Sequence, residues 1–337
     1  PIKSMKEENG LVEVVHCSSL YLYKPLVDGL LSHKGKGLSC ILTQTNEETV
    51  MLVAILRRNG VRCKLIQSMK GLMFWNMMEI RYFMRYISRH ISSPLIQDEL
   101  WEKAKLATFS VYERSNCLEY VKRCIELFEQ TNKVKYFSDF KEFVFESSVE
   151  DFCDVSGADV VVSTIHKAKG CEFDDVYMLI SGNYMRDDCL MRRYYVGMTR
   201  AKHRLFIYTN GDYFNNLCAD RHLIDNESYA IPEEIVLQLS HRDVYLEFFR
   251  NRKSYVLALR SGDSLTYDNY ILYDMVGNSV AKLSVNMQKT LAEWESRGYG
   301  VRSASVRFIV AWKPKDAPKE EPEIAVLLAD LVLSLKK

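Results

Sequence analysis

Residues with the chemistry of nucleotide contacts crowd the segment Ser163–Phe173, which reads STIHKAKGCEF. Hydroxyl, imidazole and ammonium groups stand there beside a flexible turn, a set that suits contacts to phosphate and sugar; its members include Thr164, His166, Lys167 and Gly170. Glu172 follows with a carboxylate able to accept a hydrogen bond from a ribose hydroxyl. The segment therefore predicts a site for a nucleotide or a nucleic acid.

A second segment, Arg192–Arg204, contains the turn sequence GMTRA, which places Arg200 beside Gly197. The guanidinium group is planar and carries five N–H donors, so it is well suited to a phosphoryl transition state. Lys202 and Arg204 add positive charge nearby. Taken singly, each position has an ordinary explanation, because a polar strand end is often a cap and an Arg near a turn is usually solvated.

A phosphate loop of the form G-x-x-x-x-G-K-[ST], which surrounds a triphosphate with backbone N–H groups and one Lys, is absent from the sequence. The stretch Gly29–Gly37 comes nearest. Its first two glycines are one residue too far apart, and Gly37 stands where a magnesium-binding hydroxyl is required. We interpret this stretch as a turn ahead of a strand, so the chain is expected to hold only part of an ATP site.

Strands and helices alternate around these segments. Leu38–Thr43 reads as a buried strand, a helix follows from Asn46 through Arg58, and Val61–Ile66 reads as the next strand. Further strand signals come at 159–163, 175–180 and 204–209. This pattern predicts a parallel α/β sheet, with both polar segments at the carboxyl ends of its strands, where ligands of such sheets bind.

Helical periodicity interrupts the strand signals from about residue 72 to residue 150. Aromatic side chains in this block could stack on bases, namely Trp75, Phe83, Trp101 and Tyr112. At helical spacing such residues more often form a core, and we favour that interpretation.

The last part of the chain has a different sequence pattern, with short strand-like runs. Short strands are expected at 255–259, 270–273, 279–283, 305–312 and 324–333, with one helix at 287–297. These features predict a small β-barrel or open sheet. The expected domain plan is an α/β domain at 1–220 with the helical insertion at about 72–150, a connector at 221–240, and a small β-rich domain at 241–337.

Composition narrows the function classes. The 45 basic and 44 acidic residues leave a net charge of +1, so any nucleic-acid contact must come from a local patch. Nine cysteines lack zinc spacing, which predicts no metal site and reduced thiols in the cytoplasm. No apolar run could span a membrane, and no secretory leader precedes the polar start. The start on Pro1 suggests a fragment.

The two polar segments, STIHKAKGCEFDDVYML and RRYYVGMTRAKHRLFIY, are together similar to the fifth and sixth helicase motifs of the UvrD/Rep/PcrA family of superfamily 1 DNA helicases. Ile41–Glu48 resembles the start of the second RecA-like domain's regular part, with Gln44 where an Arg is common. Met191 departs from an Arg pair of which Arg192 remains. The resemblance spans about residues 10–210 and implies a RecA-like, P-loop NTPase-type sheet domain, followed here by the small mainly-β domain.

The resemblance also implies roles for the matching residues. Arg200 would be an arginine finger toward the γ-phosphate of ATP, and Glu172 would bind the ribose. Gly170 would let the backbone approach the nucleotide closely. Thr164 and His166, with Lys167, would contact single-stranded DNA. An N-terminal RecA-like domain before Pro1 would hold most of the ATP and Mg²⁺.

Two hypotheses remain. In the first, the chain is the C-terminal part of an ATP-dependent DNA helicase, with single-stranded or duplex DNA and the N-terminal domain as partners, in a DNA-repair setting; the fragment alone would be inactive. In the second, it is a nucleic-acid-binding or regulatory module that keeps the helicase fold without ATPase activity. The joint presence of Glu172 and Arg200 favours the first.

Overall fold

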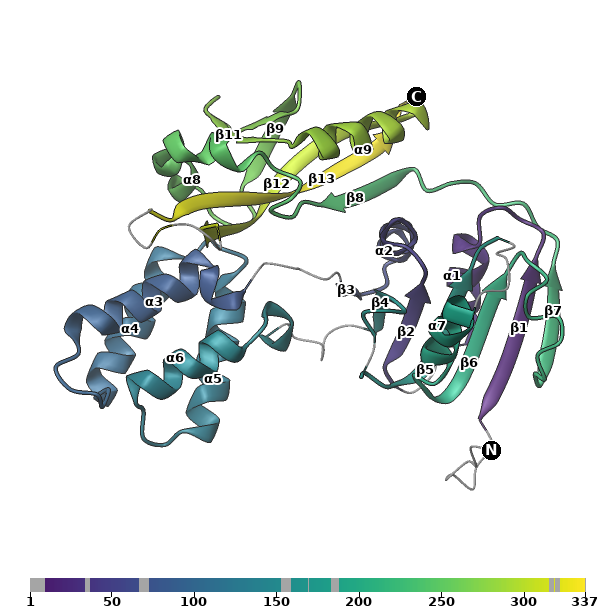
Figure 1. Ribbon diagram of the computed structural model, residues 1–337, viewed down its shortest axis with the longest axis horizontal. Helices are drawn as coiled ribbons and strands as arrows, with labels where there is room; N and C mark the ends of the chain where they lie inside the picture. The colour runs from purple at the N-terminus through teal and green to yellow at the C-terminus, as the bar shows by residue number, and fades with distance from the viewer. Residues whose placement is uncertain are drawn as a thin grey trace. The chain divides into compact units, whose positions relative to one another are not determined.

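The computed structural model describes residues 10–33, 37–66, 73–152, 159–168, 170–182, 188–314, 318 and 322–336. Its contacts divide the chain into two compact units. The first comprises Pro1–Ser68 and Asp154–Ile235, and the second comprises Met69–Cys153 and Val236–Lys337. Each unit is therefore built from two separate stretches of chain, as the colours of Figure 1 show.

The first unit contains a seven-stranded sheet. Its strands are β1 (Leu11–Cys17), β2 (Ser39–Thr43), β3 (Cys63–Ile66), β4 (Val160–Thr164), β5 (Phe173–Ile180), β6 (Ala201–Thr209) and β7 (Arg221–Asp225). They lie in the order β3-β4-β2-β5-β6-β1-β7, and all neighbouring pairs are parallel. The expected parallel α/β sheet is confirmed. Edge strand β7 falls in the stretch that the sequence suggested as a connector.

Helices cover both faces of this sheet (Figure 1). On one face, α1 (Tyr23–Ser32) and α2 (Asn46–Arg58) bury side chains such as Leu26 and Leu52 against Phe206. On the other face, α7 (Asp188–Met198) buries Tyr194 beside Met178. Successive strand residues point to opposite faces, so strands covered on both sides read as continuous apolar runs.

The rejected phosphate loop has a structural explanation. Gly29 lies inside α1, where a Cβ would fall 1.7 Å from the Tyr208 hydroxyl. Gly37 has a φ of +147° and leads into β2, whose preceding residue Leu38 donates its backbone N–H to Asp174 Oδ2 at 2.8 Å. These glycines serve helix packing and strand entry, and Gly29–Ser32 belong to α1 rather than to a turn. Residues 34–36 of the turn lie outside the described residues.

A helical block lies in the chain between the neighbouring strands β3 and β4. Its elements are η1 (Phe74–Asn76), α3 (Met78–His90), α4 (Asp98–Val111), α5 (Leu118–Thr131), α6 (Phe137–Glu146) and η2 (Val149–Phe152). Phe83 and Trp101 are fully buried, with ring centroids 5.1 Å apart, and Phe140 packs on both. The preference for core over base stacking is confirmed for these two residues.

The C-terminal part forms an open six-stranded half-barrel in the order β11-β10-β9-β12-β13-β8. Its elements are β8 (Glu234–Gln238), η3 (Leu246–Asn251), α8 (Lys253–Ala258), β9 (Ser264–Asp268), β10 (Ile271–Tyr273), β11 (Ser279–Lys282), α9 (Val285–Ser296), β12 (Tyr299–Trp312) and β13 (Ile324–Leu335). The expected mainly-β fold is confirmed. The strand predicted at 255–259 is wrong, because α8 occupies it; periodicity alone does not separate a short apolar strand from a short helix.

The helical block packs against the C-terminal sheet within the second unit. Asn116 donates its backbone N–H to Ser261 O at 3.1 Å, and the Cys117 thiol donates to Arg307 O at 3.3 Å. Met77 and Val310 form an isolated β-bridge. The helices thus share a core with strands that follow much later in the sequence. No helix within the described ranges is long and apolar enough to cross a membrane.

Candidate nucleotide and nucleic-acid site

Strands β2 and β4 end side by side at the carboxyl edge of the first unit's sheet, where Thr43 is in register with Thr164. Thr43 O accepts the backbone N–H of Ile165 at 2.9 Å. Thr164 O accepts the N–H groups of Lys167 at 3.0 Å and Ala168 at 3.2 Å. These bonds close a tight turn directly after β4.

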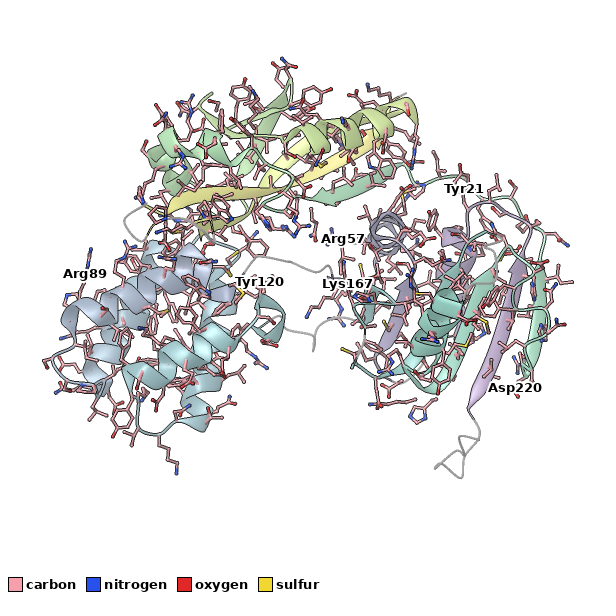
Figure 2. All side chains as sticks on the ribbon, in the orientation of Figure 1. Tyr21, Arg57, Arg89, Tyr120, Lys167 and Asp220 are labelled. Carbon is pink, nitrogen blue, oxygen red and sulfur yellow. The ribbon has the colours of Figure 1, made fainter. Side chains whose placement is uncertain are left out.

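The turn gathers three of the predicted nucleic-acid residues. The Thr164 side chain is buried, His166 is exposed and Lys167 is half-buried. Figure 2 labels Lys167 beside this end of β4. The imidazole and the ammonium group are therefore the accessible polar groups of this turn.

Glu48 organises the same edge, and the sequence interpretation assigned it no role there. Its Oε2 accepts the N–H groups of Gln44 and Thr45, both at 2.9 Å, and its Oε1 accepts Ser181 Oγ–H at 2.6 Å. Thr45 Oγ1 accepts Glu48 N–H at 3.1 Å, which completes a capping box at the start of α2. One carboxylate thus ties the ends of β2 and β5 to α2. The T-x-x-E spacing of Thr45 and Glu48 is the sequence signal that would have found it.

Gln44, which stands where the resemblance expects an Arg, lies at this edge. Its Nε2 is buried and has no hydrogen-bond partner within the described part of the chain. Leaving a buried amide donor unpaired costs free energy of folding. Gln44 thus places an unpaired polar group, but no charge, at this edge.

Glu172 and Arg200 lie at the opposite, amino edge of the sheet. They immediately precede β5 and β6, whose first residues, Phe173 and Ala201, are in register. The expectation that both polar segments sit at the carboxyl ends of strands is therefore wrong for these two residues. The physical reason is the chain path: after the turn at the end of β4, residues 165–172 return to the start of a strand that runs parallel to β4.

The Arg200 guanidinium is held by three hydrogen bonds. Nε donates to Val196 O at 2.9 Å, Nη1 to Cys171 O at 3.0 Å and Nη2 to Thr199 Oγ1 at 3.2 Å. Val196 belongs to the last turn of α7, where unsatisfied carbonyls favour a cation. Three of the five N–H donors are thus used by the described part of the chain, which offers the other two no partner.

The neighbouring residues leave room beside this guanidinium. Glu172 is exposed, and Gly170 has a φ of +89° with no heavy atom within 4 Å of the position a Cβ would take. Gly170 thus presents its backbone to open space. The three predicted cofactor residues, Gly170, Glu172 and Arg200, are brought together at this edge. In the described parts of the chain, no group of three or more His, Cys, Asp or Glu residues could hold a metal ion.

Gly197 connects the two edges. A Cβ there would lie 2.8 Å from Met178 Cε and 3.3 Å from Ile165 Cγ2. Only a glycine lets α7 approach so closely. The turn that carries His166 therefore contacts the helix that leads into Arg200.

Arg204 does not add free positive charge, contrary to the expectation from sequence. Its Nε donates to Asp175 Oδ1 at 2.7 Å, and Nη2 also donates to His33 O at 3.2 Å. The Asp175 carboxylate raises the pKa of Arg204, chiefly through this hydrogen bond. Arg204 therefore joins strands β5 and β6.

Residues 94–211 match the family model described as the UvrD-like helicase C-terminal domain, and this range contains both polar segments. Over residues 94–211 the chain is similar to UvrD-like helicase C-terminal domains. The family resemblance noted in the sequence is confirmed by this match. The matched range of the UvrD-like domain runs from the helical block through α7 and the whole of β6.

Comparison with solved structures found a likeness to the C-terminal domain of a possible DNA helicase from Lactobacillus plantarum WCFS1. The two chains are 16% identical, and the alignment covers 60% of this chain and 74% of that one, with a TM-score of 0.29. The assignment of the UvrD-like domain rests on the sequence match, because so low a TM-score does not establish a shared arrangement. No curated protein matches the chain.

Proposed function

We propose that this chain is the C-terminal part of an ATP-dependent DNA helicase or translocase, and that its amino sheet edge faces ATP. The observation that carries the proposal is the position of Arg200, fixed by three hydrogen bonds beside the exposed Glu172 at one edge of a parallel sheet. Glu172 binds the ribose, and Gly170 lets the backbone lie close to the nucleotide. ATP and Mg²⁺ are held mainly by an N-terminal RecA-like domain that supplies the phosphate loop.

Arg200 then acts as an arginine finger. Its two remaining N–H donors bind phosphoryl oxygens of ATP. A fixed planar cation at this place stabilises the negative charge of the transition state. The bonds to Val196 O and Cys171 O hold the guanidinium before the nucleotide arrives, so little ordering is required during the reaction. In related NTPases such a residue contributes about a thousandfold or more to the rate.

At the carboxyl edge, Thr164, His166 and Lys167 contact single-stranded DNA in this proposal. The contact between Ile165 and Gly197 supports coupling of the two edges, because Ile165 is next to His166 and Gly197 is three residues before Arg200. A shift of the turn on DNA would press on α7 and displace the guanidinium. Packed elements of this kind transmit small displacements because the interior is dense.

Arg200→Ala in the complete protein tests the proposal. We expect ATP hydrolysis to fall about a thousandfold or more, while ATP binding changes little, because the finger acts mainly in the transition state. Steady-state hydrolysis and binding of a fluorescent ATP analogue are the measurements. Arg193→Ala is the matched control, since Arg193 is an exposed arginine of α7, the helix that precedes Arg200. Unchanged hydrolysis by Arg200→Ala would remove the finger assignment.

A second candidate function is a nucleic-acid-binding or regulatory module without ATPase activity. The replacement of the expected Arg by Gln44 favours it, because one phosphate-binding charge is then lost. A complete protein that binds single-stranded DNA, shows no ATP turnover, and binds equally well with and without ATP would support this alternative over the motor.

A further inference from the structure

A small pocket lies in the second unit between α3 and the C-terminal sheet. Its volume is about 210 Å³, and its polar lining consists of Arg81, Tyr82, Arg85, Tyr112, Lys253 and Glu323. The volume is below the roughly 300–1,000 Å³ of pockets that enclose a whole small-molecule ligand. It suits one phosphate group or one base of a longer ligand.

The pocket carries surplus positive charge. Arg81 pairs with Glu323, with Nη1 and Oε1 3.3 Å apart. Within the described part of the chain, neither Arg85 nor Lys253 forms an ion pair. Glu323 balances one of the three cations that line the pocket, so two positive charges are left over there.

Helix α3 extends this charge beyond the pocket. Arg81, Arg85 and Arg89 stand at intervals of four residues and so form one row along the helix, with steps of about 6 Å. Arg85 and Arg89 are exposed, and Figure 2 shows Arg89 at the outer end of α3, pointing away from the helical block.

An aromatic row runs beside the arginine row. Tyr82, Tyr86 and His90 share the same four-residue spacing, and the rings of Tyr86 and His90 are 4.5 Å apart. Inside the pocket, the rings of Tyr82 and Tyr112 meet edge to face at 5.7 Å. We name the two rows together the α3 ridge, defined by Arg81, Tyr82, Arg85, Tyr86, Arg89 and His90.

We propose that the α3 ridge and the pocket form a binding site for single-stranded nucleic acid. Arg85, Arg89 and Lys253 contact successive phosphates, and a base lies against Tyr82 and Tyr112. Cations that follow the backbone beside stacking aromatic rings are the arrangement that binds single strands without sequence preference. A phosphorylated peptide would use the cations but would leave the aromatic row without a function, so the rings favour nucleic acid.

Tyr112 has the properties that a base-facing ring requires. Arg260 lies over the ring, 4.8 Å from its centroid, and the ring also lines the pocket. Burial, together with the nearby Glu79 carboxylate, raises the pKa of Tyr112 to about 12. A tyrosine hydroxyl is neutral at physiological pH with or without this shift, so Tyr112 does not repel a phosphate.

This site goes beyond the proposed function. It lies in the second unit, requires no ATP, and shares no residue with the turn at Thr164, His166 and Lys167. The two proposals can therefore fail independently.

The test uses the full 337-residue chain and a fluorescein-labelled oligo-dT strand, with binding followed by anisotropy at 50 and 200 mM salt. The salt slope for single strands is about 0.7 per phosphate neutralised, so losing two contacts in Arg85→Ala/Arg89→Ala makes the affinity drop between these salt concentrations about sevenfold smaller. Arg123→Ala/Lys133→Ala is the matched control, since both are exposed cations elsewhere in the helical block. Equal salt slopes for the ridge variant and wild type, with both folded by circular dichroism, would overturn the proposal.

Two single variants test the pocket itself. Glu323→Gln frees Arg81 and should tighten oligo-dT binding, whereas Tyr82→Leu keeps apolar bulk but removes the ring and should weaken binding about tenfold. Unchanged binding by both variants contradicts the site.

Photo-crosslinking of an iododeoxyuridine strand separates the two nucleic-acid proposals. Adducts on peptides that contain Tyr82 or Tyr112 support the α3 ridge. Adducts found only near His166 overturn the ridge and leave the proposed function intact. If a phosphopeptide but not unlabelled oligo-dT displaces the iododeoxyuridine strand, the pocket belongs to a protein partner. That result would overturn the nucleic-acid proposal as well.

Discussion

At the scale of single residues, two arginines four positions apart have different surroundings. Arg200 is held by carbonyl and hydroxyl oxygens, none of which carries a full negative charge. Arg204 is paired with the buried carboxylate of Asp175 and serves the sheet. Both were visible in the sequence as basic residues of one segment, but only the strand register separates the charge that we propose as functional from the structural one.

Glu79 gives a prediction at the same scale. Its Oε1 accepts the Ser115 hydroxyl at 2.7 Å, while its Oε2 is buried with no hydrogen-bond partner among the described residues. Burial raises the pKa of Glu79, and the bond from Ser115 opposes the shift only in part. The folded state therefore holds this proton to a higher pH than the unfolded state does. The free energy of unfolding therefore falls as pH rises from the pKa of Glu79 in the unfolded state to its higher pKa in the folded state. Above both pKa values this loss of stability remains constant.

Glu79→Gln should remove this penalty, because an amide of the same shape keeps the acceptor for Ser115 and cannot ionise. We expect the variant to be more stable than wild type at pH 7 and equally stable near pH 4, each unit of pKa difference amounting to about 1.4 kcal/mol. Urea unfolding at both pH values is the measurement. Glu113→Gln, at an exposed position, is the control. A variant less stable than wild type at pH 7 would contradict the predicted effect of burial.

At the scale of elements, the start of α2 fixes one edge of the site. Thr45→Ala removes one capping bond and should cost about 1 kcal/mol. Glu48→Ala removes three accepted bonds that join β2, β5 and α2, in a side chain that is nearly fully buried, and should cost about 2–4 kcal/mol. Thermal unfolding shows which of the two variants is more destabilised. Glu47→Ala, at an exposed neighbouring position, serves for comparison. Equal destabilisation by Thr45→Ala and Glu48→Ala would show that the link to β5 contributes nothing.

The sequence predicted those elements whose local pattern agrees with their place in the fold. Strand β4 begins with three consecutive valines and is buried along its whole length, and α2 has its acidic residues in the first turn. Strand β1 was missed because Glu13 interrupts its apolar run, although that side chain is buried, and β7 was missed because its residues are mostly exposed. A local sequence pattern does not show that a charged residue is buried or that an exposed segment pairs at the edge of a sheet.

The sequence named members of the candidate site, whose roles stay predictions, but not the layout of the site. Residue types and spacing pointed to Thr164, His166, Glu172 and Arg200. They could not show that the first two and the last two lie at opposite edges, since that depends on the direction in which each strand is entered. The contact through Gly197 was equally hidden, because it joins a helix to a turn distant in the chain.

At the scale of the whole molecule, the helical block depends on the C-terminal sheet for part of its burial. A chain ending at residue 240 should therefore expose Cys117, whose thiol contacts Arg307 O, while Cys124 stays protected by the helices themselves. Alkylation by N-ethylmaleimide followed by peptide mass spectrometry measures both thiols, and the full-length chain gives the baseline. Protection of Cys117 in the shortened chain would mean that the helices close over it without the sheet.

This discontinuous construction also bears on biosynthesis. Residues 73–152 leave the ribosome well before residues 241–336, to which they must bind. At about 5–20 residues per second, the helical block waits on the order of ten seconds or more for its partner strands. During that time apolar groups destined for the shared interface, such as Met77, face water or a chaperone. The second unit can complete its folding only when synthesis of the C-terminal strands has finished.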